Sequence, residues 1–253
     1  MIDLRLGRWE DVLQGVEVDA LICDPPYSAR THDGQATGEG PSRLDRGRRI
    51  LRGPVPFNAW TPPDVHGFVT AWNLRVRGWI ACLTDSELMP HWREAFDRVG
   101  RCSFAPVPCV IRGMTCRLAG DGPSSWAVYL MVARPRSQPW SKWGTLPGAY
   151  ASGRGPGVKR EGWIGGGKPL SLMRQIIRDY SRPGDLVCDP CAGHSTTLIA
   201  ARCEGRRAIG SEVDEGAYNA SVERIDTMGR TYGWSAEDID SAPSGPVQVR
   251  MWE

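Results

Sequence analysis

Two short segments of the sequence carry side chains suited to chemistry on a planar molecule with an amino group. The first is Asp24-Pro25-Pro26-Tyr27, called the acidic corner below, which follows an apolar run at residues 18–23. Proline has no backbone N–H, so two in succession leave carbonyl oxygens as acceptors beside a carboxylate. The Tyr27 ring offers a flat surface on which a base can stack. The corner predicts a site that accepts hydrogen bonds from an amine, although a rigid turn with a surface tyrosine is the alternative interpretation.

The second segment, residues 189–197, also follows an apolar run and consists mainly of small residues. We call it the small-residue turn. Small residues let the backbone approach a ligand, and the amino end of the helix expected next favours negative charge. Glu212 lies 23 residues beyond Asp189, where an acid can hydrogen-bond a ribose diol. These features predict a nucleoside-binding unit. The turn lacks the Gly-x-Gly-x-x-Gly pattern, which counts against a nicotinamide cofactor.

Alternating strand-like and helix-like segments must position these two sites. Apolar runs predict strands at residues 18–23, 78–84, 102–111, 126–133, 186–189 and 208–210. Helical patterns fit residues 62–75, 86–99 (with Ser86 as N-cap), 169–180, 196–203 and 214–225. This alternation predicts an α/β fold whose mostly parallel sheet has helices on both faces. Ligands in such folds bind outside the carboxyl ends of the strands.

The 253 residues are expected to form a single domain over residues 1–253. Residues 28–58 and 134–165 are rich in glycine, proline and arginine and are predicted to be loop insertions, and residues 230–253 a polar tail. No apolar run reaches the roughly 18 residues of a membrane span, and the first residues lack a signal-peptide core. We therefore expect a soluble, cytoplasmic protein that does not engage a membrane.

The eight cysteines mostly occupy apolar stretches, where reduced cysteine behaves as a small hydrophobic residue. Cys188 and Cys191 form a Cys-x-x-Cys pair that could indicate zinc or redox chemistry. The pair has no second ligand pair at metal spacing, so we interpret it as structural and expect no metal.

Charge is unevenly distributed although the net charge is only +2. Residues 134–178 contain nine basic side chains against one acidic one, and residues 212–253 contain nine acidic against three basic. A basic middle region fits contact with the phosphates of a polyanion. A solvated, charged loop explains the same charges equally well.

In combination and order, these motifs resemble the β-class DNA amino-methyltransferases, the N6-adenine and N4-cytosine family. In that family an Asp-Pro-Pro-Tyr-like motif precedes a Lys-Pro helix, then a strand ending in an Asp-Pro-Phe-x-Gly-Ser-Gly-Thr-Thr-like turn, then an acid that holds the cofactor ribose. The corresponding segments here are the acidic corner, Lys168-Pro169, the small-residue turn and Glu212. The resemblance covers most of the chain outside residues 28–60, 134–165 and the tail.

The resemblance implies a Rossmann-like methyltransferase fold that uses S-adenosyl-L-methionine. It implies that Glu212 holds the ribose, that Val213 packs on the adenine, and that Lys168, Pro169 and Asp24 border the methionine end. The implied cofactor-binding residues are Cys23, Asp24, Lys168, Pro169, Asp189, Pro190, Cys191, Ala192, Gly193, Ser195, Thr196, Thr197, Glu212 and Val213. The implied catalytic residues are Asp24, Pro25, Pro26 and Tyr27.

By the same resemblance, the target base is flipped out of double-stranded DNA, and its amine donates to Asp24 and to the Pro25 carbonyl while Tyr27 stacks on the ring. An aspartate at the head of the motif favours adenine N6 as the target, with cytosine N4 as the alternative. An RNA or protein-amide methyltransferase is disfavoured, because those enzymes generally place the cofactor turn first. Homodimers and a companion restriction endonuclease are further partners that the family suggests.

Three positions depart from the family pattern. Cys191 replaces the usual phenylalanine, and His194 and Ser195 stand where the family has Ser-Gly. If the second glycine is needed for a positive φ, Ser195 weakens cofactor binding, and a DNA-binding protein with a dead cofactor site becomes the alternative function. His194 is either a ligand contact or merely an exposed loop residue.

Target recognition in the family usually lies in the variable segment before the Lys-Pro helix. Here that segment interleaves basic residues with Trp140, Trp143 and Trp163, a composition suited to phosphate contact and base stacking. For Trp143 and Trp163, packing against the core is the equal alternative. The predicted DNA-binding residues are Arg43, Arg48, Arg49, Lys142, Arg154, Lys159 and Arg160.

Overall fold

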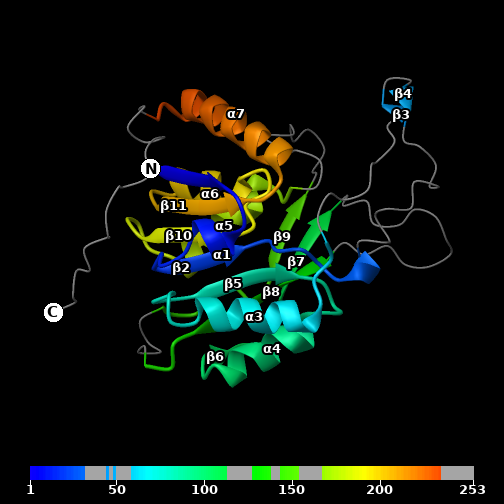
Figure 1. Cartoon of the computed structure of the whole chain (residues 1–253), viewed down its shortest axis with the longest axis vertical. Helices are drawn as coiled ribbons and strands as arrows, with labels where there is room; N and C mark the ends of the chain where they lie inside the picture. Colours follow the sequence, from blue (N-terminus) through cyan, green and yellow to red (C-terminus); the bar gives the residue numbers. More distant parts are fainter. Residues whose placement is uncertain are drawn as a thin grey trace.

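A computed structural model gives the arrangement of most of the chain. The structure describes residues 1–31, 44–45, 48–49, 58–112, 127–137, 143–153 and 167–234. Figure 1 shows a central sheet with helices on either side of it. The predicted α/β architecture, with a mostly parallel sheet between two helical layers, is confirmed.

The main sheet contains nine strands within the described residues, in the order β1-β11-β10-β2-β5-β8-β7-β9, with β6 paired to β8. The first five strands in this spatial order, β1, β11, β10, β2 and β5, run parallel to one another. Strand β8 is antiparallel to β5, β7 and β6. The bounds are β1 Ile2–Leu6, β2 Ala20–Cys23, β5 Ile80–Thr84, β6 Cys102–Ser103, β7 Val107–Arg112, β8 Ala127–Arg134, β9 Tyr150–Gly153, β10 Leu186–Asp189 and β11 Arg207–Glu212. Two short strands, β3 Leu44–Asp45 and β4 Arg48–Arg49, form a separate hairpin.

Helices cover both faces of this sheet, and each face has its own core. Helices α5 (Leu170–Tyr180), α6 (Thr196–Cys203) and α7 (Glu215–Tyr232) contribute to one core, and α3 (Pro62–Trp72) and α4 (Met89–Arg98) to the other. The short helix α1 is Trp9–Val12. Successive residues of β2 alternate between the cores, since Ala20 and Ile22 belong to the first and Leu21 and Cys23 to the second. This alternation explains why a central strand is apolar at every position.

Several element boundaries differ from the sequence prediction. Helix α4 begins at Met89 rather than near Ser86, because Asp85 accepts the N–H of Leu88 at 3.1 Å and residues 86–88 form a turn. Helix α7 continues to Tyr232, into the predicted tail, and ends at Gly233 with a φ of 67°. Strand β1 was not predicted, and β9 lies inside the segment predicted to be a loop.

Within the described ranges, no helix combines the length and apolar character needed to cross a membrane. Cys188 is fully buried in the core beneath α3 and α4, as expected for a structural residue.

Candidate active site

The two sequence motifs meet at one edge of the sheet. Strands β2 and β10 are adjacent and parallel, with Cys188 opposite Leu21. The acidic corner follows β2 and the small-residue turn follows β10, so both emerge at the carboxyl ends of neighbouring strands. Contact between the thiols of Cys23 and Cys191 joins the bases of the two segments. An open α/β sheet places its ligands at this edge.

The Asp24 carboxylate is the centre of a small polar cluster. The Nζ of Lys168, which lies just before α5, donates to both carboxylate oxygens at 2.8 and 2.7 Å. The Tyr27 hydroxyl donates to Oδ1 of the same carboxylate at 2.8 Å. Only 11% of the Lys168 side chain and 23% of the Asp24 side chain are exposed, so this ion pair is partly shielded from water. The structure thus brings together three predicted site residues that are up to 144 positions apart.

Tyr27 holds its proton in this cluster. Burial, followed by the neighbouring Asp24 charge, raises the pKa of Tyr27 well above its ordinary value. The phenol is therefore a hydrogen-bond donor at neutral pH. Its ring packs partly buried against the core, and the Lys168 ammonium lies 4.8 Å from the ring centroid.

Asp85, which the sequence analysis missed, anchors the acidic corner to β5. Its Oδ2 accepts the Ser28 N–H at 3.0 Å and the Ser28 and Thr31 hydroxyls at 2.5 Å each. Burial alone raises the pKa of Asp85, but the hydrogen bonds from Ser28, Thr31 and Leu88 outweigh it and leave the pKa lowered. A signal existed in the sequence, because Asp85 directly follows an apolar strand, as Asp24 does.

The small-residue turn is tightly packed at its start. Asp189 is 1% exposed and accepts the Cys191 N–H at 3.1 Å, and the Ala192 N–H donates to the Ser211 carbonyl at 2.9 Å. Burial raises the pKa of Asp189 to about 6, although hydrogen bonds from Thr197 and Cys191 oppose this rise. Hydrogen bonds to Asp189 of β10 and Ser211 of β11 thus fix the start of the turn.

Gly193 and Ser195 both adopt left-handed backbone angles. Their φ values are 50° and 58°, and Ser195 is the one non-glycine residue with positive φ in the described part of the chain. The serine is completely buried, and its hydroxyl finds no hydrogen-bond partner among the described residues. Ser195 therefore keeps the backbone shape that a glycine would adopt, at a conformational cost.

Glu212, at the end of β11, accepts backbone hydrogen bonds from both the small-residue turn and the residue that precedes α7. Its Oε2 accepts the Gly193 N–H and its Oε1 accepts the Asp214 N–H, both at 2.8 Å. Each oxygen keeps a further lone pair for a ligand. The next residue, Val213, is 59% exposed, so an apolar side chain lies at the surface directly after Glu212.

Side chains of helix α7 donate hydrogen bonds to the small-residue turn, a role that the sequence analysis also missed. Ser221 Oγ donates to the Gly193 carbonyl at 2.7 Å. Arg224 Nη1 donates to the His194 carbonyl at 2.5 Å and to Thr196 Oγ1 at 2.8 Å. Burial, then the Arg224 charge, lowers the pKa of His194, so its imidazole is neutral at pH 7. His194 is half-buried rather than freely exposed.

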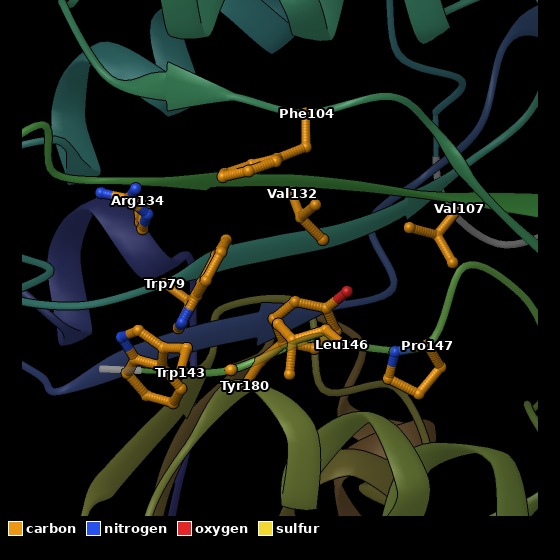
Figure 2. Close-up of a pocket in the computed structure, with 10 residues that line it drawn as sticks. Trp79, Phe104, Val107, Val132, Arg134, Trp143, Leu146, Pro147 and Tyr180 are labelled. Carbon is orange, nitrogen blue, oxygen red and sulfur yellow. The ribbon is translucent and has the colours of Figure 1, made fainter. Parts of the chain in front are cut away.

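Trp143 packs against the protein core. Its ring makes an edge contact with Trp79, with centroids 5.7 Å apart, and the Arg182 guanidinium lies 3.9 Å from its centroid. Figure 2 shows these two tryptophans at one end of a cavity of about 260 Å³, with Val107 and Pro147 at the other. Trp79 precedes β5, so this end of the cavity lies towards the amino ends of the parallel strands, away from the acidic corner.

The predicted DNA-binding side chains lie outside the described residues. These are Arg43, Arg48, Arg49, Lys142, Arg154, Lys159 and Arg160, of which Arg48 and Arg49 are described only as the backbone of β4. Trp140 and Trp163 also lie outside the description.

Comparison with known proteins identifies relatives with related names. The family model described as "DNA methylase" (N6_N4_Mtase) matches residues 161–223. YubD of Escherichia coli (strain K12), which carries the name methylase, is 33% identical over 238 residues and covers 89% of each chain. The DNA adenine methyltransferase YhdJ of the same strain is 38% identical over 72 residues, 28% of this chain and 24% of its own. Type II methyltransferase M.HindIII of Haemophilus influenzae is 43% identical over 58 residues, covering 23% and 19%. The chain thus spans about a quarter or less of the length of these last two relatives.

Solved structures share the fold at low sequence identity. The M1.HpyAVI–SAM complex has a TM-score of 0.64 and 17% identity, over 89% of this chain and 100% of the other. PvuII DNA methyltransferase, named as cytosine-N4-specific, has a TM-score of 0.55 and 14% identity, over 92% of this chain and 91% of the other. These neighbours confirm the predicted Rossmann-like methyltransferase fold.

Proposed function

The chain belongs to the N6/N4 DNA methylase family, and from this premise we propose that it transfers a methyl group from S-adenosylmethionine to adenine N6 in double-stranded DNA. One observation carries the proposal: the acidic corner, Lys168 and the small-residue turn stand together at the carboxyl ends of β2 and β10. That juxtaposition supplies acceptors for an amine beside a turn suited to a nucleoside.

The small-residue turn and its neighbours fit S-adenosylmethionine, which supplies an activated methyl group when bound. Apart from Gly193 itself and its two chain neighbours, no described residue has an atom within 4 Å of the position that a Cβ on Gly193 would take, so there is space beside the turn for a ligand. Glu212 presents two carboxylate oxygens to a ribose diol, and the exposed Val213 side chain offers an apolar surface to an adenine ring. Asp24, Lys168 and Pro169 would border the methionine end.

In the acidic corner, Asp24 would orient the target amine. A carboxylate has about four acceptor positions, and Lys168 and Tyr27 occupy three of those on Asp24. The remaining position and the Pro25 carbonyl would accept the two amine protons and direct the nitrogen lone pair towards the methyl donor. Because this geometry is unreachable inside a stacked duplex, the base would be flipped out. Orientation and local electrostatics then supply most of the rate enhancement.

The preference for adenine is supported by the aspartate at position 24 and by the name of the relative YhdJ. Cytosine N4 is the second target that this family uses, and the PvuII enzyme of the same fold is named for it. A homodimer and a companion endonuclease stay predictions from the resemblance.

Methyl transfer from labelled S-adenosylmethionine tests the proposal. The full chain is incubated with duplex DNA, RNA or protein, and the DNA is digested to nucleosides for identification of the labelled base. We expect label in N6-methyladenine, lost in Asp24→Ala and retained in Asp226→Asn, which removes an exposed carboxylate on α7. Label in N4-methylcytosine would correct the target base. Equal incorporation by wild type and Asp24→Ala would refute the role of Asp24.

Calorimetry with S-adenosylmethionine addresses the alternative of a dead cofactor site. We expect saturable binding to the wild type and weaker binding to Glu212→Gln, because the amide replaces one acceptor oxygen with a donor. Absence of binding to the wild type, with DNA binding retained, would favour the dead-site alternative.

A further inference from the structure

Three side chains with metal-binding atoms meet where α3 packs against α4. His66 comes from α3, and His91 and Glu94 come from α4. Oε2 of Glu94 lies 3.6 Å from His66 Nε2 and 4.0 Å from His91 Nδ1, and all three ligand atoms lie within 4.8 Å of one another. Two of the four histidines in the sequence are therefore at one point of the surface.

The buried contact between the two helices fixes this arrangement. Phe68 and Trp92 meet edge to face with centroids 6.0 Å apart, and both are almost completely buried. His66 lies two residues before Phe68, and His91 directly precedes Trp92. His91 and Glu94 are also three positions apart on α4, which places them on the same helix face. The backbone is thus set by packing, whereas the ligand side chains are partly exposed and can adjust.

We propose that His66, His91 and Glu94 bind a zinc-like divalent transition metal. Zinc accepts imidazole nitrogen and carboxylate oxygen at about 2.0–2.2 Å, which places tetrahedral ligand atoms about 3.4 Å apart. The observed separations need only small side-chain rotations to reach that value. Two imidazoles and one carboxylate favour zinc, copper or nickel over magnesium or calcium. Three protein ligands leave a fourth position for water.

Arg98 orients the carboxylate for this role. Its Nη2 donates to Oε1 of Glu94 at 2.5 Å, one turn along α4, while Oε2 faces the two histidines. A hydrogen bond to the second oxygen of a ligating carboxylate is the usual outer-shell arrangement in metal sites. Arg98 therefore pairs with Oε1 of Glu94 without occupying Oε2, the oxygen that would bind the metal.

A metal at this position would connect two helices that support the acidic corner. Just before α3, the Trp60 N–H donates to the Tyr27 carbonyl at 2.9 Å. Just before α4, Asp85 accepts from Ser28. Bridging α3 to α4 would therefore stabilise the elements that hold the corner from both sides, independently of whether the protein transfers methyl groups.

Zinc titration of the full, untagged, chelator-treated protein tests the site. We expect one zinc ion per chain, measured by competition with a chromophoric chelator. With cobalt in place of zinc, we expect the visible absorption bands that are typical of a metal ion with few ligands. At a zinc concentration 100-fold above Kd, the Tm should rise by about 5–10 °C. His66→Gln, His91→Gln and Glu94→Gln should each weaken binding by at least about tenfold, since losing a ligand costs no less than losing an outer-shell partner.

Glu87→Gln and His194→Gln are matched controls, because they remove a carboxylate and an imidazole elsewhere, and zinc affinity should be unchanged in both. Circular dichroism identifies any variant that fails to fold, and the remaining ligand variants then decide the result. Binding of less than one zinc, equal affinity of folded ligand variants and wild type, or equal affinity for magnesium and zinc would each overturn the proposal. None of these readouts depends on methyl transfer.

Discussion

Ser195→Gly should stabilise the protein, because Ser195 holds a left-handed conformation that glycine adopts freely. A non-glycine residue in this region costs about 1–3 kcal/mol, and a buried hydroxyl without a partner costs about 1–3 kcal/mol more. The substitution recovers most of both terms. It loses about 0.5–1 kcal/mol through the greater freedom of glycine in the unfolded chain and about 1 kcal/mol of side-chain packing. The net expectation is a gain of about 1–2 kcal/mol.

Thermal and urea unfolding measure this gain. For a chain of this size, each kcal/mol corresponds to about 2–4 °C, so the Tm should rise by about 2–8 °C. Ser195→Ala is the matched control, because alanine removes the hydroxyl but keeps the Cβ that makes a positive φ costly. Its Tm should lie below that of the glycine variant. A glycine variant less stable than wild type, or an alanine variant equal to glycine, would refute the argument from backbone strain.

Three further predictions concern the same edge of the sheet and its support. Burial raises the pKa of Asp189 from 3.8 to about 6, so the folded protein binds a proton that the unfolded chain releases between about pH 4 and 6. The free energy of unfolding should therefore fall by about 3 kcal/mol as pH rises through this window, and urea unfolding of Asp189→Asn at pH 4 and pH 7 should lack this difference. An equal difference in wild type and Asp189→Asn would contradict a raised pKa for Asp189. Asp85→Asn should cost about 2–3 kcal/mol in urea unfolding and should slow methyl transfer, because it weakens the hydrogen bonds that hold Ser28 and Thr31; unchanged stability and rate would exclude Asp85 as an anchor. Trp143→Ala should cost about 2–3 kcal/mol in urea unfolding while leaving DNA affinity in a filter-binding assay unchanged, whereas the reverse result would identify Trp143 as a DNA contact.

The sequence predicted the parts of the fold that depend on local pattern. The apolar runs ending at Cys23 and Asp189 became adjacent central strands, and the periodic segment after Pro169 became α5. Strand β1 could have been predicted too, because Ile2, Leu4 and Leu6 alternate with polar residues.

Hydrogen bonds between segments that are distant in the sequence determine the features that the local pattern did not predict. The start of α4 depends on Asp85, whose carboxylate also binds residues 54–57 positions earlier in the chain. The pairing of Lys168 with Asp24 and the support of the small-residue turn by Arg224 likewise join distant segments. Residue spacing predicts which motifs are present but not which side chain meets which oxygen.

The strand order has a consequence for how this protein is made. Strands β10 and β11, near the end of the described chain, insert between β1 and β2 from its beginning. The pairings of β1 with β11 and of β2 with β10 join residues 206 and 167 positions apart, such as Ile2 with Ala208 and Leu21 with Cys188, and long-range pairings of this kind slow folding. During synthesis, β1 and the β10-facing edge of β2 stay open until the ribosome has released Glu212, and unpaired strand edges promote aggregation. A nascent chain cut short before β11 leaves β1 without its partner strand.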